Sequence, residues 1–172
     1  MRYRDAETLS ARGQIQFKYA KRAAKLVNVF QCLIVSSDQR RREMFERAAA
    51  EGGWQTYLCA DATAALACLN RSVVQLAVVD LESRGAETLR PVIEGLTALG
   101  GPLLIVCGNE GNIEEEVWVR RLGAWLYLPG VIDGSNFTLL CGEARQIAQR
   151  LWKAARPEIG SDSPAAQRGS FS

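Results

Sequence analysis

Residues 73–82 read VVQLAVVDLE, and this stretch decides the fold of the chain. A run so rich in valine, ended by acidic residues, predicts a strand that is buried on both faces. We expect it to be the central strand of a parallel sheet, with Asp80 at its carboxyl end. Ligands of open parallel sheets bind beyond that end of the strands, so Asp80 is a candidate functional residue. The alternative is an aspartate that caps a helix or belongs to a turn.

Strand-like and helix-like segments alternate along the rest of the chain. Short apolar runs predict four more strands, at residues 29–35, 54–59, 102–107 and 125–128. Helical patterns follow the five predicted strands, at about residues 39–51, 62–69, 87–99, 113–122 and 136–152. This alternation predicts an α/β fold, a doubly wound five-stranded parallel sheet with strand order 2-1-3-4-5 in a three-layer sandwich.

Individual residues mark the ends and faces of these helices. We expect Asp38 and Asp61 to cap the helices that follow them, and Ser135 to cap the last helix. In the first helix, Phe45 is predicted to face the core and the arginines to face solvent.

The composition fits one globular domain and excludes several kinds of site. The chain has 172 residues, of which 48% are hydrophobic, and a net charge of +2. Histidine is absent, which excludes histidine-based acid–base catalysis and most catalytic zinc sites. The five cysteines form no C-x-x-C pair, so we interpret them as reduced, buried thiols and predict no metal site.

The sequence divides into three parts. Residues 1–28 are a basic N-terminal extension, predicted to be partly helical or disordered; residues 29–155 form the domain, and residues 156–172 a disordered tail. The extension is either a patch for an acidic partner, nucleic acid or a membrane, or a solvated leader, and we favour the leader. It has no helix-turn-helix pattern, so we predict no nucleic-acid binding. With no apolar run that spans a bilayer, we predict a cytoplasmic protein without membrane contact.

From about Phe30 to Ala154 the chain resembles the receiver domain of two-component response regulators. The apolar first strand ends in polar residues, and QLAVVD, residues 75–80, takes the position of the phosphoacceptor strand, with Asp80 as the phosphoacceptor. LGA at residues 122–124, followed by WLYLP at residues 125–129, is similar to the Gly-Ala pair and aromatic fifth strand of that family. Order and spacing agree along most of the chain.

The resemblance also implies a magnesium site, and there the chain departs from the family. The family's acidic pair corresponds to Ser36 and Ser37, and two hydroxyls do not replace two carboxylate charges on a hard cation. Asp38 lies one position further on, and Glu82 is a possible substitute oxygen ligand. We therefore predict no cofactor and weak or absent magnesium binding. Restoring both serines as aspartates is expected to raise the magnesium affinity.

Two further family positions are altered. The hydroxyl residue at the end of the fourth strand corresponds to Cys107, and the family's lysine at the end of the fifth strand is missing. Cys107 at a strand end also raises the alternative of a thiol enzyme. No histidine is present to activate the thiol, so we predict that the chain is not an enzyme.

These departures predict a stand-alone receiver-like signalling module that acts by protein–protein interaction, with phosphotransfer impaired. The alternatives are an atypical response regulator still phosphorylated on Asp80, and a flavodoxin-like enzyme or nucleotide-binding protein. The resemblance places the interaction face on the fourth helix, fifth strand and last helix, where Trp118, Trp125 and Tyr127 gather. The predicted partner is a signalling protein or a second copy of the chain. The alternative for the three rings is that they belong to the core.

Overall fold

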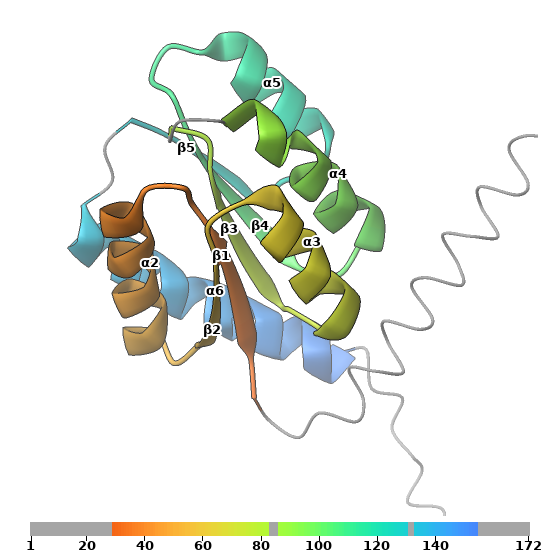
Figure 1. Cartoon of the computed structure of the whole chain (residues 1–172). Helices are drawn as coiled ribbons and strands as arrows, with labels where there is room; N and C mark the ends of the chain where they lie inside the picture. Colours follow the sequence, from red (N-terminus) through yellow and green to blue (C-terminus); the bar gives the residue numbers. More distant parts are fainter. Residues whose placement is uncertain (1–28, 83–85, 131–132, 155–172) are drawn as a thin grey trace, which may run out of the picture.

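The protein is described by a computed structural model that covers residues 29–82, 86–130 and 133–154 (Figure 1). The predicted N-terminal extension and C-terminal tail lie outside these residues. The elements in chain order are β1 (Gln31–Val35), α2 (Gln39–Glu51), β2 (Gln55–Cys59), α3 (Ala62–Arg71), β3 (Leu76–Asp80), the 3-10 helix η1 (Ala86–Leu89), α4 (Arg90–Leu99), β4 (Leu103–Gly108), α5 (Ile113–Arg121), β5 (Leu126–Pro129) and α6 (Gly134–Ala154).

All five strands pair in parallel in the order β2-β1-β3-β4-β5, which confirms the predicted topology. The predicted strand at residues 73–82 is β3, which lies at the centre, and each of its residues is buried. In the register of the sheet, Val35 pairs with Val79, and Asp80 pairs with Cys107. The polar end of β1, Asp80 and Cys107 therefore meet at one edge of the sheet.

Helices cover both faces of the sheet, which gives the predicted three layers (Figure 1). Alternate strand residues point to opposite faces. Leu33 and Val35 of β1 pack in a core with residues of α3, α4 and α5, whereas Cys32 and Ile34 pack in a second core with residues of α2 and α6. Among the described residues, no helix is long and apolar enough to cross a membrane.

Helix α2 begins and ends where local chemistry dictates. Asp38 is its N-cap, as predicted, because its carboxylate accepts a hydrogen bond from the backbone N–H of Arg41 at 3.0 Å. At the other end, Gly52 allows α2 to approach α6, since an added Cβ would lie 2.9 Å from the Cβ of Cys141. Trp54 Nε1 donates to the carbonyl oxygen of Cys141 at 2.9 Å. These contacts hold α2 in place above the sheet.

The other predicted caps have mixed outcomes. Asp61 caps α3 by accepting a hydrogen bond from the backbone N–H of Ala64 at 2.8 Å, as predicted. The prediction for Ser135 is wrong, because α6 already begins at Gly134. The backbone N–H of Ser135 donates to the carboxylate of Asp133, so aspartate supplies the acceptor for the first turn.

Candidate functional site

Asp80 is fully buried at the carboxyl end of β3, and hydrogen bonds saturate both of its carboxylate oxygens. Ser36 Oγ donates to Oδ2 at 2.7 Å, and Arg41 Nε donates to the same oxygen at 2.9 Å. Arg41 Nη2 donates to Oδ1 at 3.0 Å. The backbone N–H of Glu82 reaches Oδ1 at 3.3 Å. Asp80 is thus held as a buried carboxylate by one arginine and one serine.

Arg41 is the residue that the sequence prediction missed, since the arginines of α2 were expected to face solvent. Its side chain is only 21% exposed, and its third nitrogen, Nη1, pairs with Glu82 Oε2 at 2.6 Å. One guanidinium therefore bridges the two carboxylates. Burial alone would lower the pKa of Arg41, but the hydrogen bond and charge of Asp80, with the charge of Glu82, raise it above its ordinary value.

Glu82 is the less well compensated of the two acids. Burial raises its pKa above the ordinary value, and the negative charge of Asp80 adds to this, although Arg41 acts in the opposite direction. A single positive charge thus serves two carboxylates. The pair with Arg41 is the role that the structure gives Glu82, in place of the metal ligation considered from sequence.

The residues around Asp80 do not fit the magnesium ion that the family resemblance implies. Ser36 is buried and bonds to Asp80, while Ser37 is exposed. Asp38 is exposed and caps α2. Both acids that remain, Asp80 and Glu82, already contact the guanidinium of Arg41. Within the described ranges, no group of three or more acidic, cysteine or histidine residues is arranged to hold a metal ion.

Cys107 lies beside Asp80 on β4 and is fully buried. Burial raises the pKa of its thiol well above the ordinary value, and the negative charge of Asp80 raises it further. The reactive form of cysteine is the thiolate, so these surroundings keep Cys107 in its unreactive form. The absence of a nucleophilic role for Cys107 stays a prediction.

A second hydrogen-bonded group joins β4, β5 and α5 at the same edge of the sheet. Tyr127 is 4% exposed, and its hydroxyl donates to Glu115 Oε1 at 2.8 Å. Gly108 leaves room for this hydrogen bond, because an added Cβ at position 108 would collide with the hydroxyl of Tyr127. Glu115 Oε1 also accepts from the backbone N–H of Asn109 at 3.1 Å. The first turn of α5 is therefore fastened to the end of β4.

This burial corrects the prediction that Tyr127 is an exposed interface anchor. Trp118 and Trp125 are half-buried. Arg90 covers part of Trp118, with its guanidinium carbon 4.7 Å from the ring centroid. Trp125 packs against the core formed with α6. The aromatic rings of this region therefore serve the core more than the surface.

We expect Tyr127→Phe to lower the free energy of unfolding by about 1 kcal/mol, because it removes one largely buried hydrogen bond to a charged acceptor and leaves the ring in place. Urea denaturation followed by circular dichroism measures this change. Tyr57→Phe is the matched control, since Tyr57 is half-buried in β2, and we expect a change below about 0.5 kcal/mol. Equal effects of the two substitutions would contradict the proposed role of the hydroxyl of Tyr127.

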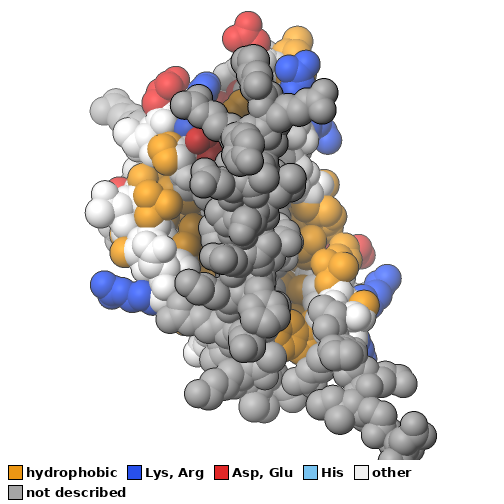
Figure 2. Space-filling view, turned by 90° about the vertical axis from the view of Figure 1, so that its right-hand side faces the viewer, with side chains coloured by type: hydrophobic (Ala, Val, Ile, Leu, Met, Phe, Trp, Pro, Cys, Tyr) orange, Lys and Arg blue, Asp and Glu red, His pale blue; other side chains and the backbone are white. Residues whose placement is uncertain are grey.

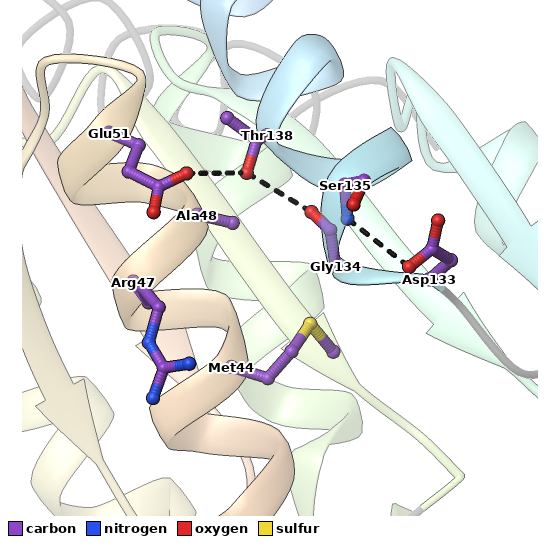
Figure 3. A pocket seen from close by; sticks show the side chains of 8 residues that line it. All are labelled: Met44, Arg47, Ala48, Glu51, Asp133, Gly134, Ser135 and Thr138. Atoms are coloured by element: carbon purple, nitrogen blue, oxygen red, sulfur yellow. Dashed lines mark hydrogen bonds between the residues drawn. The ribbon is translucent and has the colours of Figure 1, made fainter.

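A pocket of about 250 Å³, which Asp80 does not line, lies between α2 and the first turns of α6 (Figure 3). Glu51 closes one side, where its Oε2 lies 3.2 Å from the hydroxyl of Thr138. The Thr138 hydroxyl also lies 3.1 Å from the carbonyl oxygen of Gly134. The polar groups here thus bond to one another across the two helices, and Met44 supplies an apolar wall. We assign this pocket no ligand.

Comparisons with known proteins identify the fold. No family model matches the sequence, and no curated protein matches it. Among solved structures, the CheY-like receiver domain protein from Methanospirillum hungatei JF-1 matches with a TM-score of 0.64 and 18% identity, over 72% of this chain and 99% of that chain. The receiver domain of the putative Luxo repressor protein from Vibrio parahaemolyticus matches with a TM-score of 0.64 and 14% identity, over 75% of this chain and 99% of that chain.

A longer protein also matches this chain in fold. NtrX from Brucella abortus, in complex with ADP, matches with a TM-score of 0.62 and 19% identity, over 74% of this chain. This chain spans only 28% of that protein. With the five-stranded sheet in the order β2-β1-β3-β4-β5, these neighbours show that the chain has the CheY-like fold of response regulator receiver domains.

Proposed function

We propose that this protein is a receiver-like signalling module of two-component type that acts by protein–protein interaction and has lost efficient phosphotransfer. The observation that carries the proposal is the saturation of Asp80, whose two carboxylate oxygens are bonded to Arg41 and Ser36. The receiver domains among the structural neighbours support the signalling role. The ion pairs of Arg41 with Asp80 and Glu82, which together form the acidic site, support the loss of phosphotransfer.

Transfer of a phosphoryl group to a carboxylate needs two things that this site lacks. The attacking oxygen must be free to approach phosphorus, but both oxygens of Asp80 accept hydrogen bonds from Arg41. The charge on the phosphoryl oxygens must also be neutralised, usually by a metal ion with further cationic groups. The single charge of Arg41 is already shared between Asp80 and Glu82. An incoming phosphoryl group would therefore meet two carboxylates that already share the charge of Arg41.

Incubation with a small phosphodonor such as acetyl phosphate, with magnesium present, tests the proposal. We expect the intact mass of the protein to remain unchanged, because Asp80 is not accessible as a nucleophile. The Asp80→Asn variant is the control for phosphorylation at other positions. A stoichiometric gain of one phosphoryl group that disappears in this variant would overturn the proposal and support an atypical response regulator. Retention of a nucleotide or flavin through purification would instead support the third interpretation of this fold.

A further inference from the structure

Two cysteines face each other where β2 and α3 pack together. Cys59 is the last residue of β2, and its side chain lies in the same core as that of Val35, with which it pairs in the sheet. On α3, Ala65 is fully buried in this core, and Cys68 lies three residues further on, on the same side of the helix. The thiols of Cys59 and Cys68 are hydrogen-bonded to each other. The fold therefore brings two sulfur atoms together.

This pair differs from the other three cysteines in its access to solvent. Cys32, Cys107 and Cys141 are fully buried, whereas Cys59 is 5% exposed and Cys68 is half-buried. Cys68 is thus the exception to the prediction that all five thiols are buried. Figure 2 looks onto the side of the molecule where α3 and α4 lie in Figure 1, and hydrophobic side chains reach the surface there among charged ones. A small reagent from solvent therefore has access to Cys68.

The two thiols also differ in acidity. The pKa of Cys59 is raised to about 11, chiefly by burial and then by the neighbouring Cys68 and Asp61. Burial also raises the pKa of Cys68. A hydrogen bond with Ser72, the positive charge of Arg71 and the hydrogen bond with Cys59 act in the opposite direction on Cys68. Cys68 is therefore the first of the pair to form a thiolate, which is the nucleophilic form of cysteine.

We propose that Cys59 and Cys68 form a reversible disulfide bond when the protein meets a peroxide. The thiolate of Cys68 attacks one oxygen of hydrogen peroxide, so that an S–O bond forms, the O–O bond breaks and hydroxide leaves. Cys59 then attacks the sulfur of this sulfenic acid. An S–S bond forms, the S–O bond breaks, and the departing hydroxide takes the proton of Cys59 as water. In sum, two thiols lose two electrons and two protons, and hydrogen peroxide is reduced to two molecules of water.

The position of the pair at the border of the sheet favours this bond. The sulfur atoms of a disulfide are about 2.05 Å apart, which is closer than two hydrogen-bonded thiols, so β2 and α3 must approach each other slightly. Strand β2 is at the edge of the sheet and pairs with β1 alone. Helix α3 has Ala65 as its one fully buried residue, and only Ala60 and Asp61 connect it to β2. Both elements therefore have room for a small shift that the central strands lack.

The disulfide would lie close to the acidic site without taking part in it. The carbonyl oxygen of Cys59 accepts a hydrogen bond from the backbone N–H of Ser36 at 3.1 Å, and Ser36 Oγ donates to Asp80. Neither sulfur atom is among the hydrogen-bond partners of Asp80 described above. This inference therefore goes beyond the proposed function, and the result of the phosphodonor experiment does not bear on it.

Peroxide treatment of the full, freshly reduced chain tests the proposal. The protein is treated with hydrogen peroxide at about pH 8, where more thiolate is present than at neutral pH. Catalase then stops the reaction, and the denatured protein is labelled with N-ethylmaleimide and digested with trypsin. Cleavage after Arg47 and Arg71 places Cys59 and Cys68 together in one peptide, residues 48–71. This peptide is expected to carry no label and to be about 2 Da lighter than its dithiol form. Prior treatment with dithiothreitol is expected to restore both labels.

Three variants test the role of each thiol. Cys59→Ser is expected to leave a sulfenic acid on Cys68 that dimedone traps, because the resolving thiol is absent. Cys68→Ser is expected to give neither a disulfide nor a dimedone adduct on Cys59. Cys141→Ala is the matched control and is expected to form the disulfide as the unmodified protein does, since Cys141 is fully buried and alanine keeps its Cβ.

Three results would overturn the proposal. The first is a peptide 48–71 that retains both labels at a peroxide dose that fully oxidises glutathione in a parallel tube. The second is a disulfide that links two copies of the chain or involves another cysteine. The third is a dimedone adduct that forms on Cys59 in the Cys68→Ser variant as readily as on Cys68 in the Cys59→Ser variant.

Discussion

Replacing Arg41 by alanine is expected to lower the free energy of unfolding by about 2–3 kcal/mol. Removing one partner of a buried ion pair typically costs 3–5 kcal/mol, because it leaves the other charge buried without compensation. The estimate here is reduced because the side chain of Arg41 is 21% exposed, which allows water to replace part of the interaction. Urea denaturation with a two-state fit measures the change, provided that the slope of the transition is unaltered.

Arg40 is the matched control for this prediction, since it precedes Arg41 in α2 and is exposed to solvent. Arg40→Ala is expected to change stability by less than about 0.5 kcal/mol. The cost of Arg41→Ala is also expected to fall by at least about 1 kcal/mol in an Asp80→Asn background, because the uncompensated charge is then absent. Equal effects of the two alanine substitutions would show that Arg41 does not hold the acidic site together.

A divalent cation site is expected to appear when Arg41→Ala is combined with Ser36→Asp and Ser37→Asp. The two new carboxylates supply the oxygen ligands that magnesium prefers, and removal of the guanidinium frees the oxygens of Asp80. A site with a dissociation constant between about 0.1 and 1 mM would stabilise this variant by about 1.4–2.7 kcal/mol in about 10 mM magnesium. Thermal unfolding with and without magnesium, at equal ionic strength, measures this gain.

The structure adds a condition to the expectation drawn from sequence, in which the two serine substitutions alone raise the magnesium affinity. With Arg41 retained, the guanidinium remains hydrogen-bonded to Asp80, so we expect little magnesium response from that double variant. Asp80→Asn in the triple variant is expected to remove most of the response. A double variant that responds to magnesium as strongly as the triple variant would refute the view that Arg41 excludes the ion.

The sequence was sufficient for the fold because its signals were local and redundant. The valine-rich run that became β3 is buried on both faces, and a strand of that kind belongs in the centre of a parallel sheet. Asp38 and Asp61 capped the helices that follow them because an aspartate there satisfies the free N–H groups of a first turn. Asp80 reached the edge of the sheet because it ends that central strand.

The partnership of Arg41 with Asp80 was beyond sequence reasoning. Arg40, Arg41 and Arg42 follow one another in α2, and nothing in their chemistry distinguishes the one that turns inward. Only the placement of α2 above the strand ends, fixed by its packing against α6, directs Arg41 toward Asp80 and Glu82.

Tyr127 shows the same division between sequence and structure. An aromatic residue in the fifth strand is equally compatible with a core position and with an interface. Its burial was decided by Gly108 on the neighbouring strand, which leaves room for the hydroxyl, and by Glu115, which accepts a hydrogen bond from that hydroxyl.

By itself, then, the sequence determined the alternation of strands and helices and the position of Asp80 at a strand end, because each follows from residues close together in the chain. The strand order came from a general rule of doubly wound folds, and the altered acidic pair from the resemblance to receiver domains. The tertiary structure decided which charged side chains share the acidic site and which faces stay exposed. Those outcomes depend on contacts between segments far apart in sequence. Burying an unpaired charge is costly, so a buried carboxylate such as Asp80 is stable only where a distant segment supplies a positively charged partner.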